Sequence, residues 1–111
     1  MEKQKIDELT IVKIIASAGD AIGMMHQAYF EAQNGNEEKA DELLTKSEEA
    51  LVQAHQIQTT LIQNEAAGNE IEINLLMVHA QDHLMNAILT KQLIYDLISM
   101  QKQINVLKGE K

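Results

Sequence analysis

The chain has 111 residues, which is the size of a single domain, and we expect one domain over residues 1–111. It contains no cysteine, so disulfide frameworks, thiolate nucleophiles and cysteine-ligated zinc sites are excluded. Seventeen acidic residues outweigh nine lysines, and the net charge of −8 leaves no basic stripe for a nucleic-acid backbone. The sequence shows neither an uninterrupted apolar run of about 20 residues nor a charged-then-apolar leader, so we expect a cytoplasmic protein without membrane insertion.

The composition favours a helical fold. Apolar residues make up 45% of the chain but aromatic residues only 3%, which suits interdigitating aliphatic and methionine side chains better than a β-sandwich core. Polar turns at Asn34-Gly35-Asn36 and Gly68-Asn69 divide the chain into three periodic segments. We therefore predict an all-α protein with helices over about 6–33, 37–65 and 70–107. Short connections make consecutive helices antiparallel, so the expected architecture is an up-down-up three-helix bundle.

The first helix carries apolar residues at spacings of three and four, which predicts one buried stripe. Its members are Ile11, Ile15, Ala18, Ile22, Met25 and Tyr29. Gly19 and Gly23 interrupt this helix, and each costs about 1 kcal/mol relative to alanine. We expect a neighbouring helix to approach closely there, and local fraying is the alternative.

The second helix has a clear start. Asn36 is its predicted N-cap, and Glu37 and Glu38 suit the positive end of the helix dipole. Acidic residues such as Glu48 and Glu49 fall mainly on the opposite face and are interpreted as a solvated surface. The expected buried stripe comprises Ala40, Leu43, Leu44, Ser47, Ala50, Leu51, Ala54, Gln58, Leu61 and Ile62.

The third helix is the longest, so we expect it to overhang the other two or to bend, and it shows two apolar faces where a surface helix shows one. One face contains Leu76, Leu84, Ala87, Ile88, Ile94, Tyr95 and Ile98. The other, which we call the seam, approximates a coiled-coil heptad and contains Leu75, His79, Asp82, Asn86, Leu89, Leu93, Leu97, Met100, Ile104 and Leu107. A three-helix protomer covers only one of these faces, so the seam predicts self-association.

Polar residues interrupt the first half of the seam. His79, Asp82 and Asn86 occupy positions where polar groups are costly unless they are paired, bind a metal or are needed for function. Asn86 is explained well as a polar residue that fixes register. His83 lies one turn from His79 and next to Asp82, which makes this cluster the candidate site.

Histidine offers a nitrogen lone pair at neutral pH, so it can act as a nucleophile or as a ligand. The chain has no G-x-S-x-G, no H-E-x-x-H and no glutamate three residues before a histidine, which disfavours hydrolase, zinc-protease and di-iron chemistry. Transfer of a group carried on His79 remains. His26 and His55 lie on or beside apolar stripes and are expected to be hydrogen-bonded core groups.

Three stretches of the chain resemble a known family. They are Ser17-Ala18-Gly19-Asp20-Ala21, the segment from Ala54-His55 through Gln58-Thr59 to Gly68, and above all Val78-His79-Ala80-Gln81-Asp82-His83-Leu84-Met85. With these residues the chain is similar to the enzyme IIA component of the lactose/cellobiose class of the bacterial phosphoenolpyruvate-dependent sugar phosphotransferase system. The resemblance covers nearly the whole chain, and its most specific part is the last octapeptide.

The resemblance implies a parallel homotrimer, a nine-helix bundle. It implies that His79 accepts a phosphoryl group from the phosphohistidine carrier protein and passes it to a cysteine of the IIB component. It also implies that Asp82 of three protomers holds Mg²⁺ or another divalent cation at the trimer axis, with His83 and Gln81 as supporting residues. In this family the sugar, for example lactose, cellobiose or chitobiose, is recognised by the membrane component. Its identity therefore cannot be predicted from this sequence.

Family members commonly carry a basic residue after Gly-Asp-Ala in the first helix, whereas Ile22-Gly23 follows here and the chain has no arginine. The phosphoryl charge must then be stabilised by lysine, by His83, by backbone N–H groups, by the cation or by the partner. The alternative interpretation is a non-catalytic helical oligomerisation or regulatory module whose polar seam residues set the register or bind a structural metal.

Overall fold

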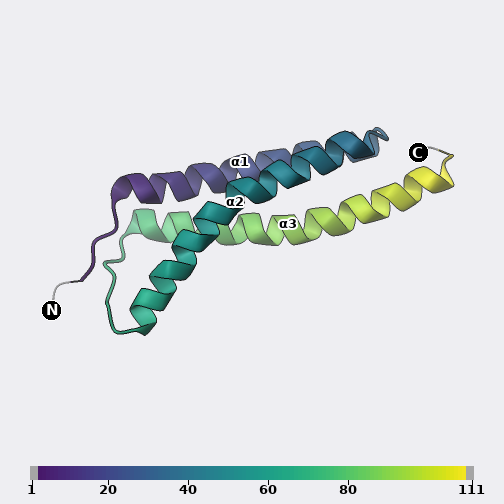
Figure 1. Ribbon diagram of the computed structural model, residues 1–111. Helices are drawn as coiled ribbons and strands as arrows, with labels where there is room; N and C mark the ends of the chain where they lie inside the picture. The colour runs from purple at the N-terminus through teal and green to yellow at the C-terminus, as the bar shows by residue number, and fades with distance from the viewer. Residues whose placement is uncertain (1–2, 110–111) are drawn as a thin grey trace.

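A computed structural model describes residues 3–109 and consists of three helices (Figure 1). They are α1 (Glu8–Gln33), α2 (Glu37–Ala66) and α3 (Leu75–Leu107). α1 and α3 run in the same direction and α2 runs against them (Figure 1). The predicted up-down-up three-helix architecture is confirmed.

The first two helices begin close to their predicted positions. The Asp7 side chain accepts a hydrogen bond from the backbone N–H of Leu9 at 3.3 Å and so caps α1 two residues after the predicted start. α2 begins directly after Asn36, as predicted, but the Asn36 side chain donates to Glu31 Oε2 at 3.1 Å instead of capping a backbone N–H. The start of α2 is therefore stabilised by Glu37 and Glu38 in its first turn rather than by a side-chain cap.

The third helix begins at Leu75, five residues later than predicted, because the segment before it is extended. Gln4 and Ile71 form an isolated parallel β-bridge, in which Gln4 N–H donates to Glu70 O at 2.7 Å and Glu72 N–H donates to Gln4 O at 2.8 Å. Ile71 is buried there. The Asn74 side chain then caps α3 by accepting from the Met77 N–H at 2.9 Å. Local polarity signals a turn at Gly68, but the pairing with Gln4 is a long-range contact that no local pattern reveals.

The core is rich in alanine, which allows the helices to pack closely. The buried face of α1 is shifted from the predicted stripe: Ile14 is buried completely, whereas Ile15, Ile22 and Tyr29 are half-buried at its edge. On α2 most of the predicted stripe is buried or packs against the core, and Ile62 is exposed. The principal buried residues are Ile11, Ile14, Ala18, Ala21, Met25, Ala28, Ala32, Ala40, Leu44, Leu51, Ala54, Met77, Ala80, Leu84, Ala87, Ile94 and Ile98.

Gly19 and Gly23 are not points of close helix packing within the protomer. Both are exposed. Among residues 3–109, no atom outside the local helix backbone and chain neighbours lies within 4 Å of the position that a Cβ would take at either glycine. The expected close approach of a neighbouring helix is therefore wrong for the isolated protomer, and the unbroken α1 also argues against fraying.

Polar contacts join α2 to α3 at the surface. Tyr95 donates a hydrogen bond to Glu48 Oε1, and Lys91 Nζ lies 3.7 Å from the same carboxylate and 6.0 Å from the Tyr95 ring centre. Burial, followed by the hydrogen bond and the charge of Glu48, raises the pKa of Tyr95 to about 12. Further along, Lys102 Nζ lies 3.5 Å from Asp41 Oδ1. These contacts fix the side-to-side position of α3 against α2.

A fully buried asparagine ties the far end of α3 to α1. Asn105 Nδ2 donates to the backbone carbonyl of Ala32 at 2.8 Å, and Gln101 Nε2 donates to Asn105 Oδ1 at 2.9 Å. The Ala32 carbonyl is in the last turn of α1, where it also accepts a hydrogen bond from the backbone N–H of Gly35 at 3.1 Å. Asn105 therefore supplies a cap from another helix and sets the register between α1 and α3.

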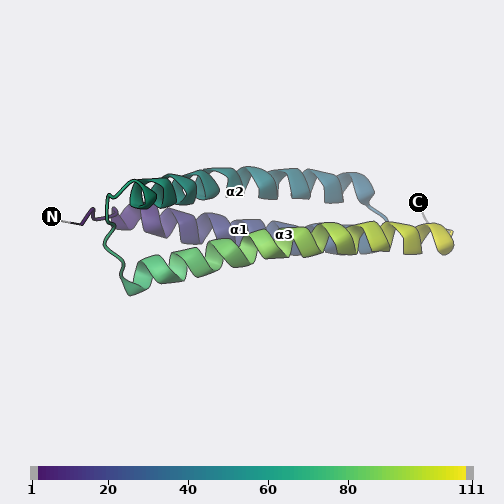
Figure 2. The ribbon, with the colours of Figure 1, turned by 90° about the horizontal axis from the view of Figure 1, so that it is seen from below.

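The protomer is a rod of 65 × 23 × 19 Å. α3 has 33 residues and a length of about 50 Å, and its C-terminal end extends past the turn that joins α1 to α2 (Figures 1 and 2). The predicted overhang is confirmed, although the later start makes α3 shorter than predicted. At the opposite end, α2 and α3 diverge in both views.

α1 is also the most apolar helix. It has the length and the apolar composition to cross a membrane, with a mean hydropathy of 1.2 over an 18-residue window, so the expectation that the chain holds no such stretch is too strict. The core helix of a soluble protein passes the same test, and α1 packs against both other helices here.

Candidate functional site

The structure brings His79 and His83 together on adjacent turns of α3. Their Nε2 atoms are 3.0 Å apart, and the two rings meet edge to face with centres 4.4 Å apart. At this distance one Nε2 carries a hydrogen and the other presents its lone pair. His79 is exposed and His83 is half-buried. The pair predicted from the spacing of four is thus confirmed, and it places an imidazole nitrogen at the surface beside a second imidazole.

Asp82 lies between the two histidines in sequence but is exposed on the seam. Within residues 3–109, no hydrogen bond or ion pair joins its carboxylate to His79, so these two members of the candidate cluster are not paired in the protomer. The described residues also contain no group of three or more histidine, aspartate or glutamate side chains that could hold a metal ion. One protomer therefore supplies a single carboxylate at this place.

Gln81 points away from the histidines. Residues two apart on a helix do not face each other, and the side-chain Oε1 of Gln81 accepts a hydrogen bond at 2.5 Å from Nε2 of Gln58, a buried residue of α2. The Gln81 side chain is therefore bonded to α2 in the protomer, and its predicted supporting role stays a prediction. The Gln58 to Gln81 bond joins α2 to α3 where they begin to diverge, beside a pocket of about 180 Å³ that is lined mainly by apolar side chains.

The seam is uncovered, as the heptad pattern predicts. Leu89 and Leu93 are 53% exposed, and Leu97 is 42% exposed, although all three are large apolar residues. Met100 and Ile104 continue the same line toward the end of α3. A contiguous exposed apolar line of this length is typical of a surface that binds another protein chain.

His26 and His55 are both exposed, so the prediction that they are core groups is wrong. The shifted register of α1 explains His26, which follows Met25 and points away from the core. On α2, His55 follows the buried Ala54 in the same way. Neither lies in the paired arrangement that joins His79 to His83.

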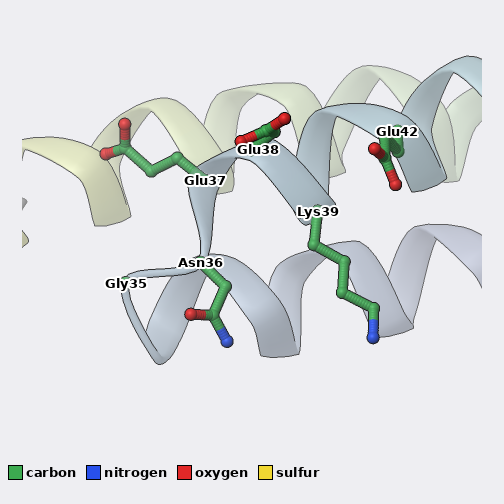
Figure 3. A pocket seen from close by; sticks show the side chains of 6 residues that line it. All are labelled: Gly35, Asn36, Glu37, Glu38, Lys39 and Glu42. Carbon is green, nitrogen blue, oxygen red and sulfur yellow. The ribbon is translucent and has the colours of Figure 1, made fainter.

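An open hollow lies at the opposite end of the rod from His79. It measures about 550 Å³ and lies at the turn into α2, where its lining includes Glu37, Glu38, Glu42 and Lys39 (Figure 3). Acidic side chains at a helix N-terminus stabilise the helix dipole. This hollow is open to solvent, and we assign it no role in the chemistry of the histidine pair.

Comparison with known proteins gives a consistent result. Residues 9–102 match the family described as "PTS system, Lactose/Cellobiose specific IIA subunit". The lichenan-specific phosphotransferase enzyme IIA component of Bacillus subtilis is 41% identical over 102 residues, which are 92% of this chain and 93% of that protein. The lactose-specific EIIA component of Streptococcus mutans is 39% identical over 99 residues, which are 87% of this chain and 95% of that protein.

Solved structures agree. The crystal structure of the cellobiose-specific enzyme IIA from Bacillus anthracis has a TM-score of 0.83 and 40% sequence identity, covering 89% of this chain and 91% of that one. The IIA(Chitobiose) chain in solution structures of its HPr complex from Escherichia coli has a TM-score of 0.76 and 32% identity, covering 88% and 95%. The sequence match and the shared fold establish that this chain belongs to the lactose/cellobiose-specific IIA family of the sugar phosphotransferase system.

Proposed function

We propose that this protein is a phosphoryl carrier that holds the phosphoryl group on His79 during uptake of a disaccharide. The observation that carries this proposal is the exposed His79 imidazole with the Nε2 of His83 at 3.0 Å. A carrier must meet two partners in turn, so its nucleophile has to be accessible. A buried histidine at the same sequence position would not meet this requirement.

The chemistry is two successive in-line transfers. The His79 nitrogen attacks the phosphorus of the phosphorylated histidine on the carrier protein HPr; a new N–P bond forms as the old one breaks and the HPr imidazole leaves. The cysteine thiolate of the IIB component then attacks the same phosphorus, an S–P bond forms, and the His79 imidazole is released. Such transfers depend on positioning and on charge stabilisation more than on further covalent steps.

His83 has a defined place in this sequence. When its Nε2 carries the hydrogen, the N–H donates to the His79 Nε2 lone pair and leaves that nitrogen unprotonated. This hydrogen bond breaks when the same lone pair attacks phosphorus, and the released N–H can then donate to the phosphoryl oxygens. This contact offsets part of the charge in a chain that has no arginine for the purpose.

We further propose that the protein works as a parallel homotrimer joined along the seam. Three Asp82 carboxylates would then converge at one axis, where they would repel one another unless a cation or a proton compensates them. Carboxylate oxygens suit Mg²⁺ or a similar divalent cation, and Asp82, exposed on the seam, would be its protein ligand. The cation would neutralise this charge and so hold the three chains together.

The proposed partners follow from the family. One solved relative is a IIA(Chitobiose) chain in complex with HPr, which supports HPr as the donor for this chain. A IIB component is the acceptor in the proposed scheme. Both reactions take place in the cytoplasm, where the proposed carrier would be located.

The test is phosphorylation with purified enzyme I, HPr and phosphoenolpyruvate, followed by mass spectrometry of the intact protein. We expect one acid-labile phosphoryl group per chain, located on His79. His79→Gln should abolish it while helical content is kept. His55→Gln is the matched control, because it removes another exposed helical histidine and should leave phosphorylation unchanged. A His79→Gln protein that still takes up stoichiometric phosphate would refute the assignment.

The non-catalytic alternative is supported by one observation: Asp82 and Asn86, like His79, are exposed polar residues in a seam whose other members are apolar, as expected of residues that set the register. The Asp82→Leu variant distinguishes the phosphoryl-carrier proposal from the non-catalytic alternative. Under the alternative, this variant is more stable and phosphorylation is not a property of the protein at all. Under our proposal, phosphorylation occurs on His79, and Asp82→Leu removes the dependence of assembly on a divalent cation.

A further inference from the structure

The linker between α2 and α3, residues 67–74, leads directly to the turns of α3 that carry His79. All of its residues are exposed except Ile71. Its start is hydrogen-bonded to the last turn of α2, and its end caps α3 through Asn74. Its middle, residues 70–72, makes no backbone hydrogen bond to either helix within the described part of the chain. What holds the middle of the linker must therefore come from elsewhere.

The backbone of Gln4 holds it. The Gln4 N–H donates to the Glu70 carbonyl at 2.7 Å, and the Gln4 carbonyl accepts from the Glu72 N–H at 2.8 Å. This segment is itself anchored, because Ile6 is half-buried and packs against the core. We call residues 4–6 the strap. In both views it lies beside the linker at one end of the rod (Figures 1 and 2).

Ile71 connects the strap to α3. Its side chain is 9% exposed, although its neighbours in the linker are open to solvent. It lines the pocket of about 180 Å³ together with Met77 and Gln81, among others. These two residues of α3 lie two positions before and two positions after His79. The strap thus holds the one buried side chain of the linker beside the stretch of α3 that carries the nucleophile.

The start of α3 needs this support. α2 and α3 diverge at this end of the rod, and the pocket lies between them (Figures 1 and 2). His79 is the fifth residue of α3, and the first N–H groups of a helix have no partners within the helix. Asn74 satisfies one of them by accepting from the Met77 N–H at 2.9 Å. A linker that moves takes Asn74 with it, and the uncapped first turns of a helix open readily.

We propose that the strap positions His79 for phosphoryl transfer, with the backbone of Gln4 as the positioning group. This proposal rests on the carrier function proposed above. Gln4 acts at a distance, through Ile71 and Asn74, on the turns that hold the nucleophile. In-line transfer needs the nitrogen lone pair aimed at phosphorus, and a small displacement of the nucleophile lowers the rate steeply. A loosened strap therefore lowers the rate of transfer between docked partners and leaves docking itself intact.

The test compares two proline variants of the full chain. Gln4→Pro removes the N–H that donates to Glu70, because proline has none. Lys5→Pro is the matched control: it introduces the same residue one position later, where the N–H makes no backbone hydrogen bond among residues 3–109. Single-turnover transfer from phosphorylated HPr is measured over a range of HPr concentrations, which separates the rate at saturation from the half-saturating concentration.

We expect Gln4→Pro to lower the rate at saturation about fivefold and to leave the half-saturating concentration unchanged, because losing one hydrogen bond shifts a two-state equilibrium by about this factor. Lys5→Pro should keep the rate at saturation, where its lost charge, which acts on association, no longer matters. Hydrogen exchange of the Glu72 N–H reports on the strap directly, since this group donates to Gln4, and it should become faster in Gln4→Pro alone. Circular dichroism should show the same helical content in all three proteins.

The outcomes separate this proposal from the one on which it rests. If the unchanged chain takes up no phosphoryl group from HPr, the carrier function is wrong and the strap proposal falls with it. If the unchanged chain is phosphorylated and Gln4→Pro reaches the same rate at saturation, the strap does not position His79, while the carrier function stands. An equal loss in Lys5→Pro, or a change in the half-saturating concentration alone, would also overturn the proposal. A loss at saturation confined to Gln4→Pro supports it.

Discussion

Replacing Asn105 with aspartate probes the contact that joins α3 to α1. The change keeps the size of the side chain but exchanges the Nδ2 donor for an oxygen, so that two acceptors face each other where a 2.8 Å hydrogen bond now lies. Asn105 is fully buried. Losing the hydrogen bond costs about 1 kcal/mol, and leaving a buried charge without its partner brings the expected loss in free energy of unfolding to about 3–5 kcal/mol.

The pH dependence of this variant gives a second check. Burial should raise the pKa of the introduced carboxyl group above its value in the unfolded chain. A group with a raised folded-state pKa is stabilising at low pH and loses this contribution as the pH rises, so the Asn105→Asp protein should regain stability between pH 7 and pH 5. The protonated carboxyl group can again donate a hydrogen bond to the Ala32 carbonyl.

Urea denaturation followed by circular dichroism measures both effects, with all proteins at one concentration because assembly contributes to apparent stability. Gln103→Glu is the matched control: it also adds one negative charge near the end of α3, but at an exposed position, and should cost less than about 0.5 kcal/mol. A loss below about 1 kcal/mol at pH 7, or a loss that does not shrink at pH 5, would refute the structural role of Asn105.

Four further outcomes are expected. Leu97→Asp, at an apolar seam position that is 42% exposed, should reduce the mass in sedimentation while circular dichroism shows unchanged helix, and an unchanged mass would contradict the seam as the interface. In a Tyr29→Phe chain, Tyr95 is the only tyrosine, and its absorbance titration should centre near pH 12, since burial and then Glu48 raise its pKa to about 12; a midpoint near 10 would contradict the contact. The stabilising contribution of Tyr95 should accordingly be complete below pH 10 and decline as the pH rises toward 12, which alkaline denaturation of Tyr95→Phe would show as a smaller loss of stability over that range. Gln58→Leu should lower the free energy of unfolding by about 1 kcal/mol, because Gln81 loses its donor, and an unchanged urea midpoint would contradict the importance of this bond.

The helices, their directions and the uncovered seam can be predicted from periodicity, because a helix that is buried on one side has apolar residues at spacings of three and four. The same spacing does not decide which of two adjacent apolar residues points into the core. Ile14 and Ile15 are adjacent and equally apolar, and only the position of the other helices decides that Ile14 is buried completely. For the same reason, the spacing predicts that His26 is in the core, whereas the structure shows that it is exposed.

The parts that the sequence does not predict depend on contacts between distant residues. The late start of α3 results from pairing with Gln4, and the cap on α1 comes from Asn105, which is 73 residues away from Ala32. At the candidate site, the spacing of four predicts that His79 meets His83, since it acts within one helix. The direction of Gln81 depends on Gln58 in another helix, so the sequence alone could not reveal that it faces away.

The position of α1 between the other two helices has a consequence for the order of folding. α1 leaves the ribosome first and forms one side of every major helix contact, so α2 can pair with it while α3 is still being made. α3 then completes the bundle by packing against α1, which is already in place. The Asn105 hydrogen bond can form only at the end, because Asn105 lies near the C-terminal end of α3. During synthesis, the seam on α3 is therefore made only after α1 and α2 of the same chain can already have paired. This order limits premature association between incomplete chains.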